Sequence, residues 1–148
     1  MTIISFGHEY YMQQAFIQAQ EAFEADEIPV GVVVVCNDVI IAKAHNLTER
    51  LNDVTAHAEM MAITQATESL GGKYLHDCTL YVTLEPCPMC AGALHWSQIS
   101  RVVYGASDPK RGCLKHQPTL LHPKTELIGG VLENKCSDII KQFFQKKR

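Results

Sequence analysis

A chain of 148 residues, 47% apolar and 20% charged, is long enough to bury one hydrophobic core and too apolar for an intrinsically disordered protein. It has no apolar run near the roughly 20 residues that cross a bilayer, and its N-terminus lacks the basic and then apolar order of a secretory signal. We therefore expect one cytoplasmic domain over residues 1–148 and no membrane partner.

The charges are distributed unevenly along the chain, although the net charge is only −3. Residues 1–100 contain 3 Lys or Arg and 12 Asp or Glu, whereas residues 101–148 contain 10 and 4. The negative total argues against a nonspecific nucleic-acid binder. The basic C-terminal third fits either a solvated helix and tail or a surface that binds a polyanion, and charge alone leaves both interpretations open.

The chain opens with the pattern of a helix followed by a hairpin. Apolar residues at helical spacing predict a helix over residues 5–26. Two β-branched runs, 30–35 and 39–44, predict strands joined by the turn Cys36-Asn37-Asp38. These two runs are expected to form a hairpin-like pair of strands.

The middle of the chain alternates between helical and strand patterns. Thr55 is the expected N-cap of a helix that ends near Leu70, because two glycines follow it. A buried strand is predicted over residues 78–84. Pro88 suits the first position of a further helix that runs to about Trp96.

The last third completes the expected fold. It predicts a strand over residues 101–104, a loop over 107–123, a strand over 125–128 and a helix over 133–144. A helix, a hairpin and then alternating strands and helices indicate an α/β fold in three layers, α-β-α. We expect a central mixed sheet of about five strands.

Two short motifs carry most of the chemical information: His57-Ala58-Glu59 and Pro86-Cys87-Pro88-Met89-Cys90. One imidazole and two thiols are zinc ligands, and three protein ligands leave the fourth position of a tetrahedral ion open, as in catalytic sites. The Glu59 carboxylate would move protons as a general acid and base without binding the metal. The motifs predict a hydrolytic zinc enzyme with His57, Cys87 and Cys90 as ligands.

Other interpretations of these motifs stay open. Glu59 could be a first-turn glutamate favoured by the helix dipole. A zinc-stapled binding module without activity would need a fourth protein ligand, for which His76 and His95 are the nearest candidates. Metal analysis combined with a substitution of Glu59 would separate such a module from an enzyme.

The motifs and their flanks resemble the bacterial tRNA adenosine deaminase family, which has the cytidine-deaminase-like fold. The matching segments are 27–31, 55–59, 80–90, 91–93 and 101–105, with a weaker match over 132–144. The resemblance implies hydrolytic deamination of adenosine to inosine at the wobble position (34) of tRNA. It also implies one Zn²⁺ per chain, the tRNA anticodon loop as partner, and a homodimer.

The substrate contacts of the family carry over one residue at a time. By resemblance, Asn46 hydrogen-bonds the target base, and Ile28 and Leu84 form part of the pocket wall. Asp108 and Lys110 lie in the loop that contacts the nucleotides flanking the target.

By the same resemblance, Phe144 lies at the aromatic end of the last helix, near the anticodon loop. The chain departs from the family pattern after Lys110, where residues 111–118 replace a small, glycine-rich segment. Because this departure falls on the side expected to face RNA, an alternative substrate stays open: a free nucleobase or nucleoside of the guanine or cytosine type. Asn46, Asp108, Lys110 and the basic C-terminal third favour RNA.

Overall fold

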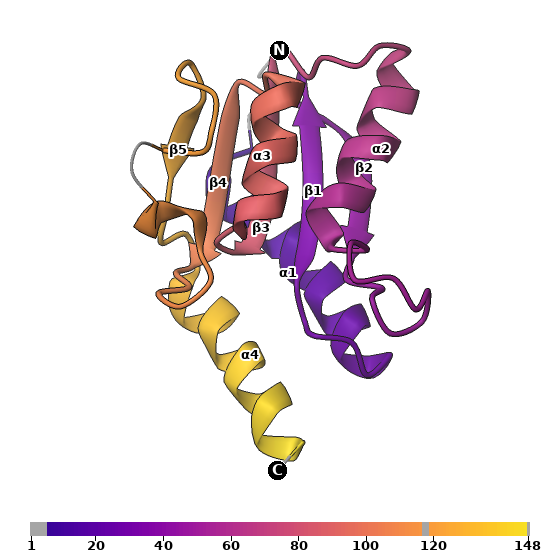
Figure 1. The fold of residues 1–148 in the computed structure, drawn as a ribbon, viewed down its shortest axis with the longest axis vertical. Coiled ribbons are helices and arrows are strands. Elements are labelled where there is room, and N and C mark those ends of the chain that lie inside the picture. Colours follow the sequence, from indigo (N-terminus) through magenta and orange to yellow (C-terminus); the bar gives the residue numbers. More distant parts are fainter. Residues whose placement is uncertain (1–5, 117–118, 148) are drawn as a thin grey trace, which may run out of the picture.

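A computed structural model describes residues 6–116 and 119–147 and shows helices on both faces of one five-stranded sheet (Figure 1). The strands are β1 (Gly31–Cys36), β2 (Val39–His45), β3 (Cys78–Leu84), β4 (Arg101–Ala106) and β5 (Glu126–Ile128), in the order β2-β1-β3-β4-β5. β1 pairs antiparallel with β2 and β3, whereas β4 runs parallel to β3 and β5. The predicted mixed sheet of about five strands is confirmed.

The outer layers are the helices α1 (His8–Glu24), α2 (Ala58–Leu70), α3 (Pro88–Ser97) and α4 (Glu133–Lys146). Successive side chains of a strand point to opposite faces, so Val32 and Val34 pack in the core under α2 and α3, while Val33 and Val35 pack in the core under α1 and α4. Figure 1 shows α2 and α3 on the near face of the sheet and α1 behind it. The unbroken run of valines in β1 follows from burial on both faces, and the predicted three-layer α/β architecture is confirmed.

The turn between β1 and β2 follows from the two residues that form it. Asn37 and Asp38 have φ angles of 50° and 61°, both in the left-handed region, and Cys36 pairs directly with Val39. Asn and Asp enter this region more easily than other non-glycine residues, and a two-residue turn of this kind matches the twist of a hairpin. The predicted turn is confirmed.

The start of α2 differs from the prediction. The helix begins at Ala58 with His57 as its N-cap, two residues after the expected cap at Thr55. The amide and hydroxyl of Thr55 instead donate to Asp53 Oδ1 at 2.8 and 2.7 Å, so the Thr55 side chain is engaged outside the helix. The predicted end is correct, because Gly71 adopts the left-handed conformation at φ 71° and caps the last turn.

The other predicted bounds agree with the structure to within a few residues. The first helix begins at His8, and the expected start at residue 5 lies outside the described residues. The predicted loop 107–123 contains one turn of 3₁₀ helix, η1 (Cys113–Lys115), which is too short to show periodicity in the sequence. None of the helices in the described part of the chain is both long enough and apolar enough to cross a bilayer.

Gly31 marks the closest approach of β1 to α1. A Cβ at this position would lie 2.0 Å from the carbonyl oxygen of Ala15 and 2.4 Å from the amide nitrogen of Ala19, and backbone atoms of a helix cannot give way. We expect Gly31→Ala to lower the free energy of unfolding by about 2–3 kcal/mol, measured by urea denaturation. Gly92→Ala in α3 is the matched control, because nothing lies within 4 Å of the added Cβ. The control should keep or slightly raise the stability; equal stability of the two variants would contradict the close packing at Gly31.

Candidate metal centre

Three side chains with ligand chemistry meet where two helices begin. His57 is the N-cap of α2, Cys87 is the N-cap of α3, and Cys90 lies in the first turn of α3. His57 Nδ1 lies 3.6 Å from Cys87 Sγ and 3.5 Å from Cys90 Sγ, and the three ligand atoms all lie within 4.8 Å of one another. The structure therefore brings the three predicted ligands into one group that can hold a metal ion.

The backbone at the two helix starts explains why these side chains are free to converge. His57 and Cys87 both have extended N-cap conformations, with φ −73° and ψ 150° at His57 and φ −73° and ψ 169° at Cys87. The His57 side chain makes no capping hydrogen bond to α2, whereas the Cys87 sulfur is within reach of the Met89 and Cys90 amides in the first turn of α3. Pro88 can occupy the first helical position because its missing N–H would have no partner there. The positive ends of both helix dipoles face the group and favour thiolates.

The two cysteines ionise unequally. A hydrogen bond from the Cys90 side chain lowers the pKa of Cys87 to about 5 in spite of burial, and the Met89 and Cys90 amides of α3 act in the same direction. That same hydrogen bond, together with burial, raises the pKa of Cys90 well above its usual range. Without a metal, Cys87 is the thiolate and Cys90 its donor. A cation that binds both sulfurs must therefore displace the Cys90 proton.

Glu59 lies beside this group without belonging to it. It is the second residue of α2, and its side chain is buried. Burial raises the pKa of its carboxyl to about 7, against the lowering effect of a hydrogen bond from its own backbone amide, and Cys87, His57 and Cys90 are among the groups that act on it. A carboxyl that titrates near neutral pH can both accept and donate a proton, as a general acid and base requires.

Among the described residues, no fourth His, Cys, Asp or Glu joins the three-residue group. The His76 imidazole is hydrogen-bonded to Gln98 Oε1 at 2.9 Å, and the His95 ring packs against Trp96 and His122. A structural zinc site fills all four positions with protein ligands. The arrangement favours a site with an open position over a zinc staple.

Ile28 and Asn46 lie at the same edge of the sheet as the metal group. Ile28 precedes the start of β1, and Asn46 follows the end of β2. Because β1 is antiparallel to both β2 and β3, the end of β3 lies at this same end of the strands. The Asn46 amide donates to the Val30 carbonyl at 3.2 Å, and Asn46 Nδ2 donates to the Thr48 hydroxyl at 3.3 Å. Asn46 is buried and Ile28 is exposed. The role of Ile28 in a pocket wall and the contact of Asn46 with a base stay predictions.

Leu84, Asp108 and Lys110 also lie near this edge. Leu84 is the last residue of β3 and packs against the core under α1 and α4. Asp108 is half-buried and Lys110 is exposed. The loop that contains both residues lies against the metal motif, since the Cys113 amide donates to the Pro86 carbonyl at 2.8 Å. The roles of these three residues toward a substrate stay predictions.

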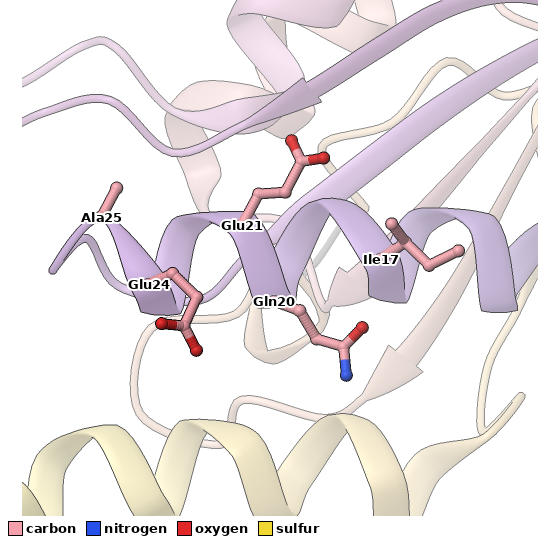
Figure 2. A pocket seen from close by; sticks show the side chains of 5 residues that line it. All are labelled: Ile17, Gln20, Glu21, Glu24 and Ala25. Atoms are coloured by element: carbon pink, nitrogen blue, oxygen red, sulfur yellow. The ribbon is translucent and has the colours of Figure 1, made fainter.

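Phe144 is not brought into the metal group. It is exposed in the last turns of α4, whereas its neighbour Phe143 is buried and packs edge to face on Phe23 of α1, with 6.1 Å between ring centroids. An open hollow of about 480 Å³ along α1 is lined by residues none of which is a predicted site residue: Ile17, Gln20, Glu21, Glu24 and Ala25. Figure 2 shows these five side chains along α1. This hollow therefore carries none of the predicted chemistry.

Sequence reasoning missed the role of two buried carboxylates near the site. Glu27 and Glu85 are only 1% and 6% exposed. Glu27 accepts the amides of Glu49 and Arg50 at 3.0 and 2.8 Å, and Glu85 accepts two amides of the loop that follows β4. Each glutamate lies within two positions of a proline and close to the end of a strand, but this pattern does not reveal the backbone amides that it binds.

Comparison with known proteins agrees with this geometry. The profile of the MafB19-like deaminase family matches residues 6–148. The tRNA-specific adenosine deaminase of Bacillus subtilis (strain 168) is 46% identical over 145 residues, which are 95% of this chain and 90% of that protein. A solved structure from a study of A-to-I editing by tRNA:A34 deaminases at the wobble position of transfer RNA is 43% identical, covers 88% of this chain and 98% of its own, and has a TM-score of 0.82.

A guanine deaminase structure from Bacillus subtilis is 42% identical but covers only 69% of this chain and 66% of its own, with a TM-score of 0.66. The match to the tRNA-specific enzyme extends over nearly the whole of both chains. This chain therefore belongs to the deaminase family, and within it to the tRNA-specific adenosine deaminases.

Proposed function

We propose that this chain is a zinc-dependent hydrolase that deaminates adenosine to inosine at the wobble position (34) of tRNA. The observation that carries the proposal is the three-ligand group of His57, Cys87 and Cys90 with the buried Glu59 carboxyl beside it. Such a group with one open position is the arrangement that hydrolytic metal sites use.

The spacing of the ligand atoms supports zinc as the metal. With Zn–N of about 2.0–2.1 Å and Zn–S of about 2.3 Å, a tetrahedral ion has N···S edges of about 3.6 Å. The corresponding distances from His57 Nδ1 are 3.6 and 3.5 Å. One imidazole and two thiolates are also ligands that zinc prefers. We infer one Zn²⁺ per chain.

When bound, zinc supplies a Lewis acid that brings the pKa of a water at the open position to about 7. Glu59 would take a proton from the attacking water and deliver protons to a ring nitrogen of the purine and to the leaving amine. A carbon–oxygen bond forms, the bond to the exocyclic amine breaks, and ammonia leaves. In the metal-free protein, burial raises the pKa of Glu59 to about 7, so its carboxyl exchanges protons near neutral pH.

The surroundings of the metal group support RNA as the substrate. The loop that touches Pro86 contains Lys110, Arg111 and Lys115, all exposed, so three cations lie in the chain segment next to the metal motif. Cations beside a pocket for one base suit an unpaired loop, whose phosphates need neutralising and whose bases are already free of partners. The basic C-terminal third is thus better explained by a polyanion than by solvation alone. The activity of the relatives points the same way.

Within this site, we propose that Asn46 hydrogen-bonds the target base, since an amide both donates and accepts. Ile28 and Leu84 would form the wall of the base pocket, and Asp108 and Lys110 would contact the flanking nucleotides. Phe144 would contact the RNA farther from the target base, because the structure places it at the end of α4.

We also propose that the protein acts as a cytoplasmic homodimer. The bacterial tRNA-specific relatives support the cytoplasm as the location. Large apolar side chains that are exposed in the single chain support contact with a second copy: Leu51 at 49%, Val54 at 85% and Trp96 at 79%.

Purified zinc-loaded protein is expected to form inosine at position 34 of an anticodon stem-loop that contains adenosine there. Raising the salt from about 50 to 200 mM should slow the reaction at subsaturating RNA, because phosphate contacts are screened. Digestion to nucleosides followed by mass spectrometry measures the product. Free adenosine should react far more slowly, since it lacks the flanking nucleotides that position the base.

Free guanine and cytidine are the controls for the alternative substrate class, and the guanine deaminase relative makes guanine the sharper of the two. Ammonia release from either compound, with no inosine in the stem-loop, would contradict a tRNA substrate and identify a free-base or nucleoside deaminase.

A further inference from the structure

We infer that Glu85 is a positioning residue that holds the loop of residues 108–114 against the metal centre and so sets where the nucleotides beside the target base bind. The inference takes its substrate from the proposed function, whereas the contacts that carry it belong to the chain alone.

The Glu85 carboxylate ties the two ends of this loop to one point. Glu85 follows directly after β3, and its side chain is only 6% exposed. Its Oε1 accepts the Asp108 amide at 3.0 Å, and its Oε2 accepts the Leu114 amide at 2.9 Å. Both oxygens of one buried carboxylate are therefore used on backbone groups that enter and leave the loop.

The loop is shaped around this carboxylate. A Cβ added at Gly112 would lie 1.9 Å from Glu85 Oε2 and 2.3 Å from Glu85 Cδ. Gly112 has φ −72° and ψ 157°, a backbone conformation that any residue adopts, so the reason for a glycine here is space: for Glu85 first, and for the Asp108 carbonyl oxygen, 2.6 Å from such a Cβ. The Gly112 amide also closes the loop on the Asp108 carbonyl at 2.8 Å.

The clamped loop is a wall of the metal centre and contains cations. The Cys113 amide donates to the Pro86 carbonyl at 2.8 Å, one residue before the ligand Cys87. Lys110 and Arg111 are exposed at the tip of the loop. Glu85 therefore fixes the distance between these cations and the metal ligands. A nucleotide bound with its base at the metal and its phosphate at the cations would have to span this distance.

Only a carboxylate can make both bonds. A carboxylate offers acceptors on both oxygens, whereas a glutamine amide keeps one acceptor and turns two N–H donors toward the second loop amide. Glu85→Gln is therefore expected to release one end of the loop without changing the volume of the side chain.

Cys113 reports whether the loop is docked. Its side chain is 1% exposed, and it is the one cysteine in the tryptic peptide of residues 112–115. Alkylation of zinc-loaded protein with iodoacetamide, followed by mass spectrometry of that peptide, measures how often the loop opens. In Glu85→Gln this rate should rise about 10-fold, as expected for the loss of one charge-assisted hydrogen bond. Burial and, after it, the Glu85 charge raise the pKa of the Cys113 thiol, so Gly112→Ala, which keeps that charge, tests loop opening apart from thiol ionisation.

Glu27→Gln is the matched control. It makes the same chemical change on a buried carboxylate that accepts two backbone amides, at 3.0 and 2.8 Å, but in the loop after β2. Its Cys113 alkylation should stay within about twofold of wild type, so a general loss of stability would be recognised by a rise in both variants.

Kinetics test the positioning role. With the stem-loop as substrate, Glu85→Gln should raise KM about 10-fold and leave kcat within about threefold, because only binding of the flanking nucleotides is weakened. Reaction with free adenosine and the zinc content should not change. A purely structural role would lower activity on both substrates together.

A second set of variants tests the contact between Glu85 and Gly112. Gly112→Ala should open the loop by crowding the carboxylate, as Glu85→Gln does by removing a bond. In the Glu85→Ala background the carboxylate is gone and only the Asp108 carbonyl oxygen, 2.6 Å from the added Cβ, still crowds this position, so adding Gly112→Ala should raise Cys113 alkylation clearly less than it does in wild type. Additive effects of the two alanine substitutions would overturn the contact.

The outcomes separate this inference from the proposed function. If wild-type protein forms no inosine in the stem-loop, the proposed substrate is wrong, and alkylation of Cys113 still decides whether Glu85 holds the loop. Unchanged alkylation in Glu85→Gln would overturn the clamp for any substrate. Faster alkylation with an unchanged KM for the stem-loop would overturn the positioning of substrate.

Discussion

Replacing Glu59 with glutamine is expected to reduce inosine formation at least about 10²-fold while the fold and the bound zinc are retained. Glutamine keeps the shape of the buried side chain but can no longer take a proton from water or return one to the purine. The loss should appear in kcat with saturating stem-loop, and metal analysis on the same sample should show unchanged zinc. Glu68→Gln, at an exposed position of the same helix, is the control and should be fully active.

Stability against pH separates a catalytic Glu59 from a structural one. Burial raises the pKa of its carboxyl to about 7 in the metal-free fold, above the value of about 4.3 expected in the unfolded chain. The native state therefore binds this proton more tightly than the unfolded chain does. As the pH rises from about 4.3 to about 7, ionisation of this carboxyl lowers the free energy of unfolding, and the full cost is present above pH 7. Metal-free Glu59→Gln should thus be at least as stable as wild type at pH 8. Loss of zinc in this variant would make Glu59 a ligand, and near-normal turnover would contradict its role as acid and base.

Cys90→Ser is expected to remove most of the bound zinc and, with it, much of the stability of the protein. Loss of a ligand should weaken zinc binding by more than the roughly 10–100-fold that loss of a ligand's hydrogen-bond partner costs. The thermal midpoint of wild type should fall when a chelator is added, whereas the midpoint of the variant should hardly change, because it has little metal to lose.

Cys136→Ser is the matched control for this change. Cys136 is as fully buried as Cys90 but lies in α4 and outside the three-residue group. It should keep one zinc per chain and the response to chelator. Stoichiometric zinc in Cys90→Ser, measured by elemental analysis, would remove Cys90 from the ligand set.

Much of the fold could be predicted because the deciding interactions are local. Asn37 and Asp38 allow the left-handed turn of the hairpin, and Pro88 starts α3 at the position where its missing N–H has no cost. The predicted N-cap at Thr55 was wrong for an equally local reason, which the N-cap preference of threonine does not take into account. Its hydroxyl and amide are already bonded to Asp53, two residues before it.

The site could be predicted only as far as the identity of its ligands. The motifs indicate His57 and Cys87, but 30 residues separate them, and only the packing of α2 and α3 shows that their ligand atoms lie 3.6 Å apart. Glu85 could not be found in this way, because its partners are backbone amides 23 and 29 residues later. A backbone amide carries no signature in a sequence, so a side chain that binds one cannot be recognised from residue types.

The metal group lies at the starts of two helices, whereas the neighbouring cations lie in a loop, and this division has an evolutionary consequence. The metal ligands lie at helix starts whose other faces form the core, so changes there disturb folding and chemistry together. The cations beside them lie in a loop that one carboxylate attaches to the sheet. If the loop positions the substrate as proposed, we expect insertions or replacements in it to change the substrate while the metal group and Glu59 stay the same. This separation offers a physical route by which one deaminase scaffold diversifies between a base within RNA and a free base.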